Sequence, residues 1–222
     1  MIKKLDSMSL RVAAFFGLSA MFFNVLAIFY LQNAASSYKP FVTEQWLSEI
    51  VKVPGEVTGS VISFILGVCA LLPFAWILSR TLSEPLKSLV RCFFLIGVMF
   101  NAIGVVTPMI VVKNIMPVCT EVATCNAIAA GFLSFALVMD SAFNFFFGFG
   151  LFFLGIGLFK NSFLSRLSAG LSSIGGLLTV TVCLQFMNQS SQSMLYIAGP
   201  IWLLFLIVAA AEMLKMSFSS EE

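Results

Sequence analysis

The stretch that decides the fold is Ala136–Phe159, ALVMDSAFNFFFGFGLFFLGIGLF. At ~1.5 Å per residue, an α-helix of this length crosses the ~30 Å hydrocarbon core of a bilayer. Its single acidic residue is Asp140. A carboxylate in a spanning helix is costly unless it faces other helices or a polar cavity. We therefore expect Asp140 to face the interior of a helix bundle, near the outer mouth.

Helical periodicity separates two faces of this stretch. At ~3.6 residues per turn, one stripe carries the small and polar residues, and phenylalanines fill most of the remaining circumference. The stripe consists of Ser141, Asn144, Gly148, Leu151 and Gly155. We predict that the stripe packs against other helices, whereas the phenylalanines, Phe147 among them, face acyl chains.

Composition supports a membrane protein. The chain has 222 residues, of which 60% are hydrophobic and 10% charged, with a mean hydropathy of +1.04. Soluble domains carry roughly 25% charged residues. The absence of histidine excludes His-dependent catalytic triads and His-ligated zinc or haem. The basic residues are scattered, so we expect no nucleic-acid partner, and no residue pattern indicates a cofactor or a metal.

The apolar pattern recurs along the chain and predicts an all-α, integral membrane bundle of six transmembrane helices, forming one domain over residues 1–222. The spans are expected at about 12–31, 55–78, 88–111, 136–159, 167–185 and 195–214. We interpret the first as a span, because its apolar run exceeds the ~7–15 residues of a signal peptide. In the first external loop, TEQWLSEIVKV (Thr43–Val53) is amphipathic and predicts a short interfacial helix.

Lysine and arginine are distributed unevenly between the two predicted sides. Nine lie at the N-terminus, the C-terminal end and the connectors 79–91 and 160–166, and three lie in the opposite loops. Cytoplasmic loops carry an excess of basic residues. Both termini are therefore expected in the cytoplasm.

Small residues recur every four positions in the second span. Gly55, Gly59, Ser63 and Gly67 form a small-xxx-small pattern, which lets two helix backbones approach closely. We predict a helix-packing face here. Similar stripes occur in the third span (Gly97, Asn101, Gly104, Pro108) and in the fifth (Ser168, Ser172, Gly176, Thr179).

Four polar side chains lie within the predicted spans on small-residue faces: Asp140, Asn144, Asn24 and Asn101. The three asparagines lie roughly 15–23 Å from the basic inner ends of their helices. One interpretation is an outward-opening cavity that binds a small polar or cationic ligand, with Asp140 as the counter-charge. The other is hydrogen bonding between helices without a ligand. The residues alone leave both open.

Cys119 and Cys125 fall in the second external loop, where an oxidising compartment permits a disulfide. Their spacing suits a bridge that closes a small loop, and unpaired thiols or redox chemistry remain alternatives. It does not match C-x-x-C or four-ligand zinc motifs.

The spans lack the residues that known intramembrane enzymes require. No second aspartate accompanies Asp140, no histidine is available for a serine protease, and no span carries a central lysine for a Schiff base. We therefore predict no catalytic activity.

GLFKNSFLSRLSAGLSSIGGLL (Gly157–Leu178) and GPIWLLFLIVAAAEMLK (Gly199–Lys215) resemble a bacterial family of six-helix membrane proteins, domain of unknown function 4386. The resemblance covers roughly the last third of the chain, and the connector has Leu164-Ser165-Arg166 where the family usually has a proline and a tryptophan. It implies a bacterial inner-membrane location and assigns no activity.

Three classes of function follow from these patterns. The first is a binding, sensing or accessory protein that acts on a membrane-protein partner, or a homo-oligomer, through its glycine-rich face. The second is a small-molecule transport component with a cavity around Asp140. The third, an enzyme acting on lipid, lacks a catalytic residue set.

Overall fold

The computed structural model describes residues 5–34, 48–186 and 194–219. Its helices are α1 (Ser7–Ala34), α3 (Pro54–Ser79), α4 (Leu86–Ile110), α5 (Val122–Asn161), α6 (Arg166–Val182) and α7 (Leu195–Ser219). Five of these are long and apolar enough to cross a membrane, while α6 is shorter, with 17 residues. The described part of the chain contains no β-strand. The protein is thus an all-helical integral membrane protein.

The helices coincide with the predicted apolar segments, but the connection between α4 and α5 differs. A π-helical turn (Val111–Ile115) and a 3-10 turn (Met116–Val118) prolong α4, and α5 begins at Val122 rather than near residue 136. The second external loop, predicted between the third and fourth spans, is therefore mostly helical over residues 112–126. Asp140 accordingly lies near the middle of the 40-residue α5.

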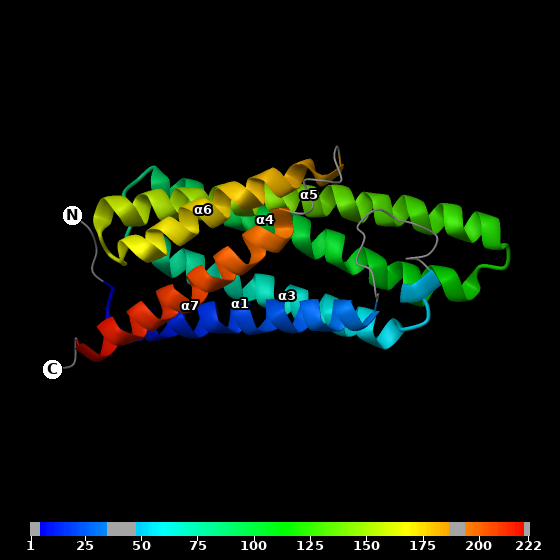
Figure 1. Ribbon diagram of the computed structural model, residues 1–222, viewed down its shortest axis with the longest axis horizontal. Helices are drawn as coiled ribbons and strands as arrows, with labels where there is room; N and C mark the ends of the chain where they lie inside the picture. Colours follow the sequence, from blue (N-terminus) through cyan, green and yellow to red (C-terminus); the bar gives the residue numbers. More distant parts are fainter. Residues whose placement is uncertain (1–4, 35–47, 187–193, 220–222) are drawn as a thin grey trace.

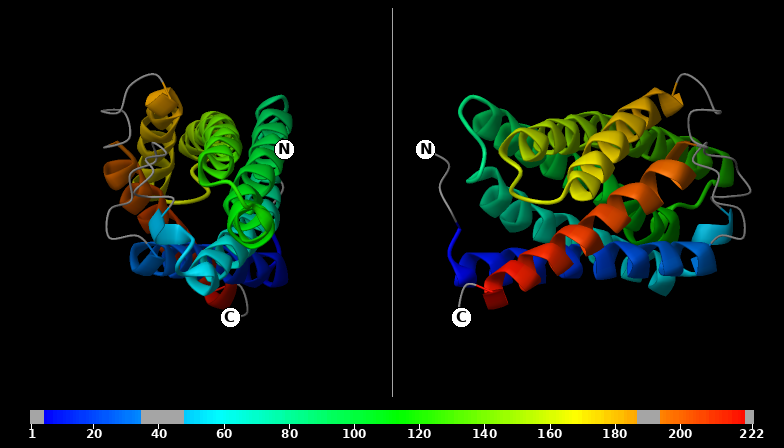
Figure 2. Two further views of the ribbon diagram at one scale, coloured as in Figure 1. Left: turned by 90° about the vertical axis from the view of Figure 1, so that its right-hand side faces the viewer. Right: turned by 60° about the vertical axis from the view of Figure 1, so that its left-hand side comes forward.

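The six helices form a closed ring. Each helix packs against its neighbour in sequence, and α1 contacts α7 to complete the circuit. Figure 1 shows the start of α1 and the end of α7 at the same end of the bundle, and the end-on view in Figure 2 shows the helices around a common centre. The connectors α3–α4 and α5–α6 also lie at that end, which we call the terminal end (Figure 1).

Only part of the predicted interfacial helix belongs to the described residues. Residues 48–50 form one helical turn, and residues 43–47 lie outside the described part. Ile50 is buried, with 1% of its surface exposed, and it packs in an apolar cluster with Val57 and Val112. This turn therefore covers the bundle at the end opposite the chain termini.

The predicted small-residue face of α3 packs against α1 within the same chain. A Cβ at Gly59 would lie 3.1 Å from the ring of Tyr30, and one at Gly67 would lie 2.5 Å from Asn24 Nδ2. Ser60 Oγ donates a hydrogen bond of 3.1 Å to the Ala27 carbonyl of α1. Ser63 is buried as well, whereas nothing lies within 4 Å of a Cβ at Gly55. Because α1 covers Gly59 and Gly67, these positions are not open to a separate partner.

Helices α5 and α6 approach each other closely at glycines. A Cβ at Gly176 would lie 2.5 Å from the backbone nitrogen of Phe152, and a Cβ at Gly148 would lie 2.7 Å from the Gly176 carbonyl. Ser172 Oγ donates 2.8 Å to the Leu151 carbonyl across this contact. The small-residue stripes of both helices thus face each other, as the periodicity predicts.

The prediction that the phenylalanines of α5 face acyl chains is wrong for Phe147 but not for all of them, since Phe145 is 38% exposed. Phe147 is 2% exposed and makes edge-to-face contacts with Phe94 of α4 and Trp202 of α7. Phe146 stacks on Phe100 at a centroid distance of 5.6 Å. Helix α5 packs against both α4 and α6, and its contacts with α4 cover part of its aromatic side.

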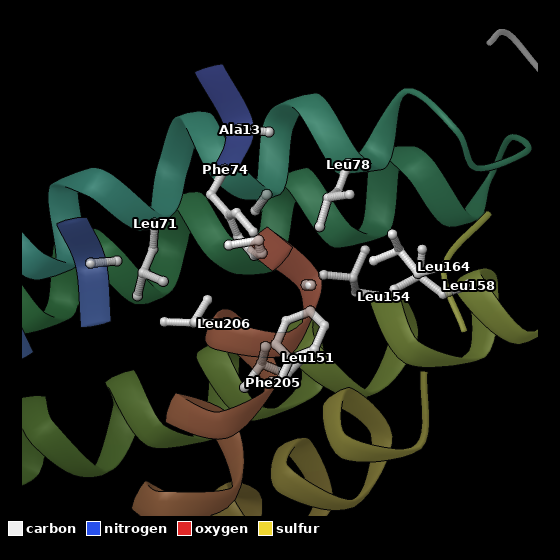
Figure 3. Packing of buried hydrophobic residues seen from close by; sticks show 14 of the residues in the cluster. Ala13, Leu71, Phe74, Leu78, Leu151, Leu154, Leu158, Leu164, Phe205 and Leu206 are labelled. Atoms are coloured by element: carbon white, nitrogen blue, oxygen red, sulfur yellow. The ribbon is translucent and has the colours of Figure 1, made fainter. Parts of the chain in front are cut away.

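Two separate apolar clusters fill the bundle. The larger cluster occupies the terminal end and includes Leu71, Phe74, Leu151 and Phe205, seen together in Figure 3. The smaller cluster contains Ile50, Val57, Val111, Val112, Ala129 and Leu133. Helix α5 contributes to both clusters, through its second and first halves respectively. The segment of α5 between them carries the polar residues.

Hydrogen bonds tie the connectors together at the terminal end. Asn161 Nδ2 donates 3.0 Å to the Thr81 carbonyl, which joins the α5–α6 connector to the α3–α4 connector. Ser165 caps α6 by accepting a bond from the Ser168 amide, and its own amide donates 2.9 Å to the Glu212 carboxylate of α7. These bonds fix the terminal end of the ring.

Candidate functional site

A cavity of about 770 Å³ lies between the two apolar clusters. Leu71 and Phe147 of the larger cluster line one side, and Ile50, Val57 and Leu133 of the smaller cluster line the other. The cavity is therefore bounded by tight packing in both directions along the bundle axis.

All four polar residues singled out in the sequence line this cavity: Asn24 from α1, Asn101 from α4, and Asp140 and Asn144 from α5. Side chains of α3, α6 and α7 complete the wall, so every helix of the ring contributes. The three asparagines are 3–4% exposed, and Asp140 is partly buried.

Asp140 and Asn144 form a pair on α5. Asn144 Nδ2 donates 3.1 Å to Asp140 Oδ2 and 2.9 Å to the Asp140 backbone carbonyl. The amide therefore orients the carboxylate at one turn's distance along the helix. A carboxylate held in this way offers acceptor oxygens to a cation or an N–H donor.

Asn24 is fixed by its own helix and by α3. Its Nδ2 donates 2.8 Å to the Ala20 carbonyl one turn earlier. The same amide lies against Gly67, at a position where a Cβ would come within 2.5 Å. Gly67 thus provides the space that Asn24 occupies at the cavity wall.

Asn101 differs from the other two asparagines. Its Oδ1 is shielded from water and has no hydrogen-bond partner among the described residues. A buried acceptor without a partner costs ~1–3 kcal/mol. The χ2 torsion of asparagine is broad, so a modest rotation can present this oxygen to the cavity. Gly104, one turn further on α4, allows α5 to approach, with the Asp140 backbone nitrogen 3.5 Å from a Cβ there.

Most of the cavity wall is apolar. Ile28, Leu31, Phe64, Val105 and Leu203 are among its lining residues. Polar side chains are thus a minority of the wall: the four named above, which we call the polar belt, are joined by Gln32, Ser60 and Thr179. Such a chamber matches a molecule with one polar end and an apolar body.

Sequence reasoning missed the contribution of the last helix. Trp202 lines the cavity and lies edge-to-face against Phe147 at 5.5 Å, and Tyr196, 68% exposed, places the rim at the surface. Thr179 of α6 also lines the wall, with its hydroxyl bonded to the Gly175 carbonyl. The one feature of the sequence that relates Trp202 to the cavity is its spacing: it lies three residues, about one helical turn, after Gly199, which also lines the wall.

The cysteines lie outside the cavity wall. A disulfide joins Cys119 to Cys125 across the α4–α5 connection. Cys69, Cys92 and Cys183 are free thiols. Within the described ranges, no three or more histidine, cysteine, aspartate or glutamate side chains gather as metal ligands.

No family model, curated protein or solved structure matches the chain. The cavity and its polar belt are therefore the basis for assigning a function.

Proposed function

We propose that the protein is a membrane-embedded binding protein that holds a small amphipathic molecule in the cavity between the two apolar clusters. The polar end of this molecule carries N–H or ammonium donors. The observation that carries the proposal is the convergence of Asn24, Asn101, Asp140 and Asn144 from three helices on one chamber of about 770 Å³. If these four side chains served only to join helices, we would expect them to bond one another across the helix interfaces rather than to line a cavity.

The hydrogen bonds support a ligand over purely structural roles. Asn24 and Asn144 use their amides within their own helices, and Asn101 Oδ1 has no partner in the described part of the chain. None of the bonds of these asparagines that we observe joins two helices. The Asn101 Oδ1 acceptor remains suited to a donor that enters the chamber.

The proposal includes a topology. We infer six spans with both termini in the cytoplasm, because the basic residues Arg11, Arg80, Lys160 and Arg166 belong to the terminal end and its connectors. The resemblance of residues 157–178 and 199–215 to a bacterial family supports a bacterial inner membrane. The cavity then lies toward the outer side, and its ligand is drawn from the outer leaflet or the periplasm.

The test is native mass spectrometry of the protein purified in mild detergent. We expect an adduct of small-molecule mass on the wild type that is lost in Asp140→Asn and Asn101→Leu. Thr107→Val is the matched control, because Thr107 is buried on α4 but bonds its own helix and does not line the cavity. An adduct that is missing from the wild type, or equal in all variants, would contradict the proposal.

A transport component is the second candidate. It is favoured by the position of the cavity between a large and a small apolar cluster, because parting of the small cluster around Ile50 would open the chamber on one side. Uptake of the identified adduct into proteoliposomes, inhibited by Asp140→Asn, separates transport from binding alone.

A further inference from the structure

A second, smaller cavity lies at the outer surface of the ring between α3 and α4, about 320 Å³ in volume. Its wall is apolar, formed by Leu72, Pro73, Ile77, Phe94 and Leu95, and it carries one cation, Arg91. Leu95 is 49% exposed and Trp76 is 48% exposed, so the groove faces the surroundings of the bundle. It shares no lining residue with the large cavity.

The guanidinium of Arg91 is held in a fixed orientation. It lies 4.0 Å from the centroid of the Trp76 ring across the helix interface. Its Nε donates 2.8 Å to Ser79 Oγ, which itself donates 2.7 Å to the Trp76 carbonyl. Stacking on an aromatic ring and one hydrogen bond together pre-organise the planar fork of an arginine.

The remaining donors of Arg91 have no acceptor among the described residues, because its one protein hydrogen bond there uses Nε. The fork of guanidinium N–H groups matches a phosphate in two parallel bonds. Lys87, one turn earlier on α4, is already paired with Glu84 at 2.9 Å and does not line the groove. Arg91 is therefore the cation of this groove that remains available to an anion.

We propose that this groove binds a phospholipid with an anionic headgroup in the leaflet at the terminal end of the bundle. The phosphate pairs with Arg91, and an acyl chain lies along the apolar wall beside Pro73 and Leu95. Three observations support a lipid: the groove lies on the exterior of a membrane protein, its cation lies beside apolar surface, and Trp76 is an aromatic residue of the kind enriched at membrane interfaces. Basic pockets between spanning helices are recognised lipid-headgroup sites.

The test uses delipidated protein in detergent and native mass spectrometry with added phosphatidylglycerol or phosphatidylcholine. We expect wild type to retain phosphatidylglycerol in preference to phosphatidylcholine, and Arg91→Gln to lower phosphatidylglycerol binding roughly tenfold. Arg91→Lys should lose part of the preference, because it keeps the charge without the fork. Lys87→Gln, the matched control, should bind within twofold of wild type.

A second measurement reports contact between the lipid and Trp76 directly. With Trp46 and Trp202 replaced by phenylalanine, Trp76 reports contact with brominated lipid by fluorescence quenching. Brominated phosphatidylglycerol should quench more than brominated phosphatidylcholine, and Arg91→Gln should remove the difference. The proposal would be overturned if the two brominated lipids quenched Trp76 equally in the protein that keeps Arg91. It would also be overturned if Arg91→Gln bound lipid as wild type does, or if millimolar inorganic phosphate displaced the lipid.

Discussion

Replacing Asn101 with leucine separates a ligand site from a structural polar cluster, because the two interpretations predict opposite signs. Asn101 Oδ1 is buried without a partner among the described residues. Leaving an acceptor unpaired costs ~1–3 kcal/mol, and an apolar group of the same shape removes that cost. Leucine is close to asparagine in shape, and the adjoining cavity leaves room for its methyl groups.

We therefore expect Asn101→Leu to raise the free energy of unfolding of the ligand-free protein by about 1 kcal/mol. If Asn101 instead joined two helices, the same change would lower it by ~0.6 kcal/mol, the average worth of a polar contact between membrane helices. The same variant should lose ligand binding. Higher stability together with lost binding is the signature of a residue retained for function.

The assay is reversible unfolding in mixed detergent micelles, followed by far-ultraviolet circular dichroism after the ligand is removed. Thr107→Val is the control, since its hydroxyl bonds only the Ile103 carbonyl of its own helix. It should change the unfolding free energy by less than about 0.5 kcal/mol. A decrease in stability for Asn101→Leu that exceeds the control would refute the reasoning.

Three further perturbations test other parts of the structure. Gly176→Ala places a Cβ 2.5 Å from a backbone nitrogen of α5 and should cost ~1–3 kcal/mol of unfolding free energy, whereas Gly199→Ala, with nothing within 4 Å, should cost none. Gly67→Ala should push the Asn24 amide from its place and weaken ligand binding, measured by adduct occupancy, with the helix content intact. Glu84→Gln should lower thermal stability at neutral pH but not under acid conditions. Hydrogen bonds from Lys87 and Ser88, with the charge of Lys87, hold the pKa of the Glu84 carboxyl below its usual value. The stabilisation by this carboxylate is therefore present above the usual pKa and is lost as the pH falls through the lowered pKa.

The positions of the helices and their inward faces could be predicted from the sequence. Apolar length defines a membrane helix, and the spacing of small and polar residues defines the side that packs. Ser172 and Gly176 of α6, for example, lie on one stripe in the sequence and are both buried against α5. Asn24 and Asn101 were likewise placed on inward faces, and both are buried.

Features that depend on three-dimensional neighbours could not be predicted. Periodicity shows which side of α5 is polar, but not that α4 and α7 cover part of its aromatic side. It therefore predicts that Phe147 faces lipid, whereas Phe147 lies in the core. The predicted span 136–159 lies within α5, but the sequence does not show that the helix begins at Val122, because a mixed segment such as residues 112–126 can form either a loop or helical turns. Nor does spacing reveal that Trp202 joins the cavity wall.

The contents of the large cavity test the central claim most directly. A cryo-electron microscopy or crystal structure of the protein purified in mild detergent, without delipidation, would show whether the chamber is occupied. We predict density for a non-protein molecule whose donor lies within hydrogen-bond distance of Asn101 Oδ1 or the Asp140 carboxylate, with its apolar part beside Trp202. A collapsed chamber, in which Asn101 Oδ1 accepts a hydrogen bond from a neighbouring helix, would contradict the account.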